Sequence, residues 1–113
     1  MWVFTTRGML SIVEHREDQN LLCVRARRRE HLTELFPLRE FQHTPYADYH
    51  WRMVLPREEV AKTLVKEVYD INYPNFKDAS DVSLRTTYAN VWADCLRMQG
   101  PIPVNLDADY DRE

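Results

Sequence analysis

Alternation of hydrophobic and polar side chains is the clearest pattern near the start of the chain. Three segments favour β-strands: residues 2–6, 9–16 and 21–28. In the last two, alternate side chains belong to opposite faces, which is the period of two of a strand. A polar turn at residues 16–20 separates these two segments. We therefore expect residues 9–16 and 21–28 to form an antiparallel ribbon, with residues 2–6 as a further strand.

Helical spacing begins after the third strand. Residues 30–36 are expected to form a short helix that Pro37 ends, because proline cannot continue a helix. Residues 41–48 are expected to form a loop, and residues 50–55 show the alternation of another strand. Pro56 then opens a longer helix at its first-turn position, where the missing N–H costs nothing.

The two longer helices are each predicted to have one apolar side. In the helix after Pro56, the apolar residues follow one another at spacings of four, four and three: Val60, Leu64, Val68 and Ile71. A last helix is expected over residues 81–99, and Gly100 is suited to end it. Asn75 is suited to cap a short turn that starts at Phe76.

The predicted order of elements is strand, strand, strand, helix, strand, helix, helix (β-β-β-α-β-α-α). We expect an α+β fold in which a small antiparallel sheet of three to four strands carries the helices on one face. The sheet is the only surface large enough to bury two apolar helix stripes. Residues 1–100 are expected to form a single domain, followed by an acidic, flexible tail at residues 101–113.

Composition limits the classes of function that this chain can serve. Its 113 residues, 44% of them apolar, suffice for one globular core without metals or disulfides. Cys23 and Cys95 have no nearby cysteine and form no zinc or redox pattern. No Walker loop or nucleophile motif is present, so we expect no cofactor, and an enzyme is the less favoured class.

Nothing in the sequence predicts attachment to a membrane. No segment approaches the roughly 18 apolar residues that a membrane span requires, and the first residues lack the pattern of a secretion signal. We therefore expect a cytoplasmic protein.

Several short runs resemble a family of small uncharacterised proteins from bacteria and their phages. The runs lie at residues 4–8, 11–16, 22–27, 47–52 and 71–77, and the resemblance extends over roughly residues 2–96. It implies a bacterial or phage cytoplasmic setting. It implies no chemistry, because the family has no established activity.

Four closely spaced arginines form the main charge concentration of a chain whose formal net charge is −3. Arg25 and Arg27 are expected to project from one face of the third strand, and Arg28 and Arg29 lie where that strand meets the next helix. Arginine binds carboxylates and phosphates through its planar fork of donors, so the group is a candidate binding site. His31 could add a further contact. Pairing of the arginines with Glu14, Glu17 and Glu30 on a solvated sheet face is the alternative.

Aromatic residues are concentrated at residues 43–52, which supply a second candidate surface. Tyr46, Tyr49, Trp51 and Arg52 are of the types that anchor protein interfaces, and the same residues could instead complete the core. The segment also contains two histidines and an aspartate, but no further metal ligand lies nearby, so we predict no metal site.

The sequence favours a non-enzymatic binding module that acts through protein–protein contacts, with a regulatory or host-modulating role in a bacterium or phage. The alternative is a nucleic-acid-binding protein that uses the arginine-bearing sheet face. A third class is a small enzyme with a histidine as general base. A homodimer would follow if the strand at residues 2–6 paired with its copy at a free sheet edge.

Overall fold

Three N-terminal strands pair antiparallel in the order in which they occur along the chain. In the computed structural model, β1 (Trp2–Thr5) pairs with β2 (Gly8–Glu14), and β2 pairs with β3 (Leu21–Ala26). The register places Ile12 opposite Val24. The ribbon predicted from alternation is therefore confirmed.

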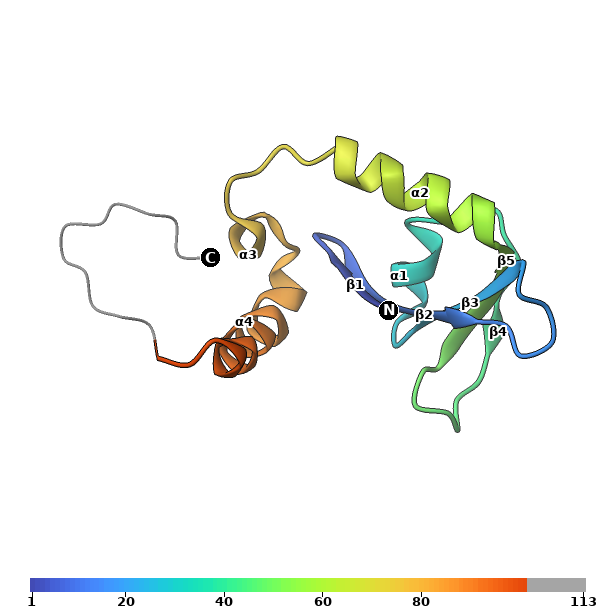
Figure 1. The fold of residues 1–113 in the computed structure, drawn as a ribbon, viewed down its shortest axis with the longest axis horizontal. Coiled ribbons are helices and arrows are strands. Elements are labelled where there is room, and N and C mark those ends of the chain that lie inside the picture. Colours follow the sequence, from blue (N-terminus) through green and yellow to red (C-terminus); the bar gives the residue numbers. More distant parts are fainter. Residues whose placement is uncertain (102–113) are drawn as a thin grey trace. The chain divides into compact units, whose positions relative to one another are not determined.

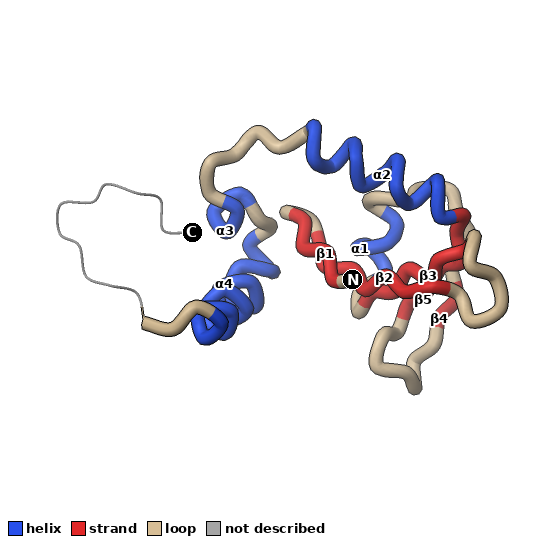
Figure 2. The backbone as a smooth tube through the Cα atoms, viewed as in Figure 1, coloured by secondary structure: helices blue, strands red, loops and turns tan. Residues whose placement is uncertain are grey.

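Two further strands complete the sheet on the other side of β3. β5 (Trp51–Pro56) pairs with β3, and β4 (Gln42–His43) pairs with β5, so the five strands lie in the order β1-β2-β3-β5-β4 (Figure 2). The α+β class and the antiparallel sheet are confirmed. The expected three to four strands and the expected element order are wrong, because β4 lies inside the predicted loop. Two residues are too few to show alternation.

Two helices of this part of the chain pack on one face of the sheet. α1 (Arg29–Thr33) contacts β2, β3 and β5, and α2 (Arg57–Tyr69) contacts β3 and β5 (Figure 1). Between them lies one core of buried side chains, contributed by three strands, both helices and the segments beside them: Leu10, Ile12, Val24, Ala26, Leu32, Phe36, Met53, Leu55 and Val60. Alternation thus assigns the apolar strand positions to the face that the helices cover.

The apolar stripe of α2 is only half buried. Val60 is buried and Leu64 packs against the core, but Val68 is 66% exposed and Ile71 is 52% exposed. The helix starts directly after β5, so its first turns are the ones that meet the sheet. The expectation that the whole stripe packs on the sheet is therefore wrong at its C-terminal end.

The chain divides into two compact units, and the second begins at Tyr73. It contains α3 (Phe76–Ala79), the 3-10 turn η1 (Val82–Leu84), α4 (Arg85–Cys95) and the 3-10 turn η2 (Leu96–Met98). The helix expected over residues 81–99 is thus α-helical only in its middle. Gly100 has a φ of 76°, which fits its predicted role as the helix-ending residue.

Local contacts hold the second unit together. The Asn75 side chain accepts a hydrogen bond of 3.1 Å from the backbone N–H of Asp78, so the predicted cap is confirmed. The rings of Phe76 and Tyr88 stack with centroids 5.3 Å apart, and Tyr88 is buried. Lys77 places its ammonium group 4.0 Å from the centre of the Trp92 ring.

The structure describes residues 1–101. The predicted tail at residues 101–113 lies outside this range except for Pro101. The single domain over residues 1–100 stays a prediction. None of the helices described within this range has the length and apolar character needed to span a membrane.

Position 8 needs a glycine because the His31 ring packs against it, not because of its backbone angles. A Cβ atom added at Gly8 would lie 2.4 Å from the His31 ring, and the Nδ1 atom of this buried ring accepts a hydrogen bond from the Met9 N–H. We expect Gly8→Ala to lower the free energy of unfolding by about 1–3 kcal/mol, the usual cost of overpacking a core. Urea unfolding measures it. In a His31→Ala background the same change should cost less, and equal costs in both backgrounds would contradict the steric explanation.

Burial raises the pKa of Tyr88 from 10.0 to about 12, and the nearby Asp81 carboxylate adds to the effect. The folded state therefore holds the phenolic proton more tightly than the unfolded chain. This stability is complete below pH 10 and is lost as pH rises towards 12. Unfolding free energies measured from pH 9 to 11 should fall more steeply for the natural chain than for Tyr88→Phe. Parallel curves would contradict the assignment.

Candidate functional site

The face of the sheet opposite α1 and α2 carries the arginines. The register places Ser11 opposite Arg25 and Arg25 opposite Arg52, so these three side chains form one row across β2, β3 and β5. The next row is apolar and consists of Val13, Cys23 and Val54. We call this side of the sheet the arginine face and define it by these six residues together with Trp2, Arg27 and Tyr49.

Tyr49 belongs to the loop before β5, and its ring packs against Arg25 of β3 and Arg27 just after it. The guanidinium carbons of Arg25 and Arg27 lie 4.8 and 4.7 Å from the centre of its ring. Only 5% of Tyr49 is exposed. Guanidinium groups are attracted to the negative face of an aromatic ring, so the ring fixes the positions of both arginines.

Neutral oxygen atoms accept hydrogen bonds from the two arginines of β3. The Nη2 of Arg25 donates to the Ser11 hydroxyl at 2.7 Å, and the Nε of Arg27 donates to the Asp48 carbonyl at 3.4 Å. The Nε of Arg25 is buried and finds no acceptor among residues 1–101. These contacts orient the two side chains without neutralising their charge.

Arg52 is the arginine of this face that does meet a carboxylate. Its Nη2 donates to Asp48 Oδ1 at 3.3 Å, and its Nε donates to the Thr44 hydroxyl at 3.3 Å. The same carboxylate oxygen accepts from the Tyr49 N–H at 3.0 Å, which anchors the loop. Within the described range, no carboxylate pairs with Arg25 or Arg27, so three guanidinium groups share one counter-charge.

The acidic residues expected to pair with the arginines, Glu14, Glu17 and Glu30, do not pair with Arg25 or Arg27. Glu14 binds Arg57 at 2.7 Å instead. Within residues 1–101, neither Glu17 nor Glu30 forms an ion pair with Arg25 or Arg27. The arginine face therefore keeps a local positive charge on an acidic chain.

The remaining predicted site residues lie elsewhere. Arg28 and Arg29 stand exposed at the start of α1, and Tyr46 is fully exposed in the loop before β5. Trp51 points to the opposite face of the sheet, because it pairs with Ala26 and packs against the core. His31 is buried beside Gly8 and is no part of the arginine group.

Trp51 is covered by its neighbours. The His43 ring stacks on it with centroids 4.1 Å apart, and Phe41 meets it edge-on at 5.6 Å. Tyr49 and Trp51 thus both lie under other side chains, so Arg25, Arg27, Tyr49 and Trp51 do not form one exposed patch. Of the three aromatic residues predicted to form a binding surface, Tyr49 is buried, Trp51 is partly buried and Tyr46 is fully exposed.

The histidines do not converge on one site. His43 and His50 are neighbours with ring centroids 6.4 Å apart, whereas His31 lies under β2 and His15 accepts a hydrogen bond from the Glu17 N–H. Within residues 1–101, no group of three or more metal-ligating side chains is close enough to hold an ion.

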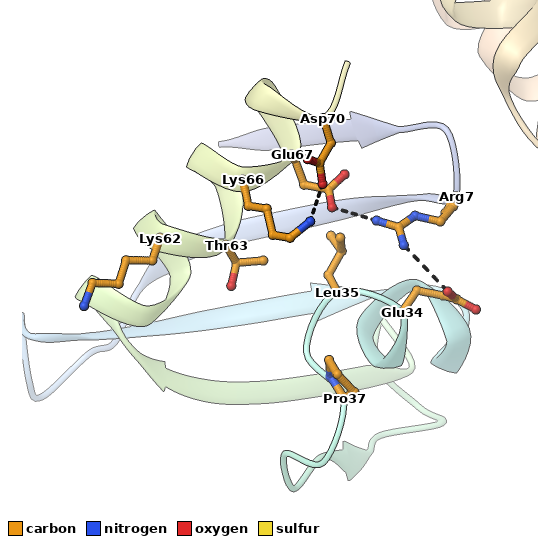
Figure 3. Close-up of a pocket in the computed structure, with 9 residues that line it drawn as sticks. All are labelled: Arg7, Glu34, Leu35, Pro37, Lys62, Thr63, Lys66, Glu67 and Asp70. Atoms are coloured by element: carbon orange, nitrogen blue, oxygen red, sulfur yellow. Dashed lines mark hydrogen bonds and ion pairs between the residues drawn. The ribbon is translucent and has the colours of Figure 1, made fainter. Parts of the chain in front are cut away.

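A cleft with a volume of about 400 Å³ lies between the end of α1 and α2 (Figure 3). Arg7 reaches into it from the turn between β1 and β2 and pairs with Glu67 at 2.6 Å and Glu34 at 3.8 Å. Lys66 pairs with Asp70 along α2. The charges within this cleft neutralise one another, which distinguishes it from the arginine face.

Sequence reasoning missed Ser11, Thr44, Val13 and Val54 as parts of the site. Alternation in β2 does predict that Ser11 and Val13 share a face, but only the register shows which residues of β3 they meet. Thr44 joins the site through the loop that β4 positions.

Comparison with known proteins gives no relative, because no family model, curated protein or solved structure matches this chain. The resemblance to small bacterial and phage proteins stays a prediction.

The ring of Tyr49 is expected to stabilise the protein through its two arginine contacts. Tyr49→Leu keeps an apolar side chain but removes the ring face, and should lower the free energy of unfolding by about 1–2 kcal/mol. Tyr46→Leu is the matched control, since Tyr46 is fully exposed and should change stability little. Urea unfolding of both variants tests this. Equal effects would show that the ring–guanidinium contacts contribute nothing.

Proposed function

We propose that this protein is a non-enzymatic binding module that docks a protein partner on the arginine face. The observation that carries the proposal is the unneutralised guanidinium group of Arg25, with that of Arg27 beside it, next to a row of apolar side chains. Arginine and tryptophan are enriched at protein interfaces, and this face carries Arg25, Arg27 and the exposed Trp2.

The apolar row is open to solvent. Val13 is 38% exposed and Val54 is 45% exposed, and Trp2 stands at the end of the arginine row, opposite Ser11, with 69% of its surface free. Covering these side chains would add hydrophobic energy to the charge contacts of Arg25 and Arg27. A small partner surface with both acidic and apolar side chains would gain binding energy from the arginines and from the apolar row.

A regulatory or host-modulating role in a bacterium or phage belongs to this proposal. Its support is the sequence resemblance alone. The cytoplasmic setting rests on the same resemblance and on the lack of a predicted membrane span or secretion signal in the sequence.

Binding of nucleic acid is the second candidate, and the unpaired guanidinium groups favour it. Base stacking finds little support beside them, because Tyr49 is buried and His43 and Phe41 cover Trp51. This candidate predicts that labelled single-stranded or duplex oligonucleotides bind at low salt, with an affinity that falls steeply as salt rises. Absence of any mobility shift at low salt removes it.

Capture of a partner from a bacterial lysate tests the main proposal. Immobilised protein should retain proteins that an unloaded resin does not, and Val54→Asp should lose them, because it places a carboxylate in the apolar row. Val68→Asp on α2 is the matched control and should retain them, since Val68 is exposed on the helix side.

Two outcomes would overturn the proposal. One is a lysate from which the natural chain retains nothing above background. The other is Val54→Asp retaining the same proteins in the same amounts as Val68→Asp. Thermal unfolding of both variants shows that each remains folded.

A further inference from the structure

Resting on the proposed function, we propose that the partner is an extended, acidic protein segment with one apolar residue and two carboxylates at alternate positions. The chemistry of the arginine face sets this pattern. Counted in the direction of β3, the order is apolar, any, acidic, any, acidic. Each step of the inference comes from the side chains that β3 presents.

Spacing along β3 provides the first step. Cys23 and Arg25 alternate with core residues of β3 and point to the same side of the sheet. Arg27 follows the last residue of the strand and meets the same Tyr49 ring as Arg25, so it lies on that side too. Side chains two residues apart on a strand are separated by roughly 7 Å. An extended partner segment has this same repeat, so one apolar and two acidic side chains can meet the three positions at once.

The free donors of the arginines provide the second step. The Nη2 of Arg25 donates to the Ser11 hydroxyl, and the Nε of Arg27 donates to the Asp48 carbonyl. An arginine carries five N–H donors, and carboxylates accept two of them side by side. Each guanidinium therefore retains donors that a partner carboxylate could take.

Asp48 shows what such a contact looks like on this face. Its carboxylate lies on Arg52, which is directly opposite Arg25 in the register. Among residues 1–101, one carboxylate meets the arginine of the neighbouring strand and none meets Arg25 or Arg27. Charge complementarity favours two further carboxylates from outside.

Pre-organisation provides the last step. Tyr49 and Ser11 already fix Arg25, and Tyr49 also fixes Arg27. Little side-chain freedom is lost when a ligand binds to groups held in this way. An ordered pair of arginines can therefore distinguish the spacing of two carboxylates as well as their charge.

The experiment uses the full chain and a synthetic peptide, TVTDTDT, followed by NMR titration of backbone amides at low salt. Two comparison peptides are TVTNTNT, which lacks the charges, and TVTDDTT, which has the same charge in adjacent positions. The chain itself carries aspartates at alternate positions (Asp107, Asp109 and Asp111), so the titration is repeated with all three changed to Asn.

We expect TVTDTDT to shift the amides of β3 and β5 and to bind about tenfold more tightly than TVTNTNT and several-fold more tightly than TVTDDTT. Arg27→Glu should weaken binding of TVTDTDT about tenfold, and Lys62→Glu, the same charge change on α2, should leave it unchanged. Arg27→Lys keeps the charge but loses the fork, and should fall between the two.

Three results would overturn the inference. They are no amide shifts at millimolar TVTDTDT, equal affinity for TVTDTDT and TVTDDTT, or a short oligothymidylate that binds more tightly than the peptide and through the same amides. If lysate capture is lost in Val54→Asp but kept in Arg27→Glu, this inference fails and the proposed function stands. If TVTDTDT binds but no lysate protein is captured, the acidic-peptide specificity of this face stands and the proposed function fails.

Discussion

The packing of one tyrosine ring against two guanidinium groups is the constraint on which the arginine face depends. Without Tyr49, Arg25 and Arg27 would be flexible side chains on a solvated strand, with entropy opposing any fixed geometry. The loop that carries Tyr49 is itself held by Asp48 and Thr44, which also contact Arg52. Ring, loop and arginines therefore order one another.

The cleft between α1 and α2 and the arginine face both contain arginines, but these arginines differ in whether carboxylates neutralise their charges. In the cleft between α1 and α2, Arg7 is neutralised by Glu67 and Glu34, so its charge holds elements of the fold together. On the arginine face, Arg25 donates to a hydroxyl group and keeps its charge. An ion pair is satisfied within the chain, whereas an oriented and unpaired guanidinium is available to another molecule. This contrast, rather than the number of arginines, singles out the arginine face.

Patterns in the sequence predicted the strands, helices and caps that depend on neighbouring residues. They did not predict the contacts between residues that are far apart in the sequence. Alternation located the β2–β3 ribbon, and Asn75 located a cap. The helix after Pro56 was also predicted, but Pro56 ends β5 and caps α2 rather than standing in its first turn. The two residues of β4 carry no periodic signal, and α2 keeps its apolar stripe beyond the point where it meets the sheet. Arg25 was recognised from its spacing, but its contact with Tyr49 spans 24 positions of the sequence and depends on the β3–β5 register.

NMR of the arginine side chains tests the central claim most directly. If Tyr49 holds the two guanidinium groups, the Nε–H protons of Arg25 and Arg27 should be shifted by the ring current, and that of Arg25, which is buried, should exchange slowly with water. Both shifts should disappear when the ring is removed. Two Nε–H signals at ordinary positions, exchanging as fast as those of a fully exposed arginine, would contradict the account.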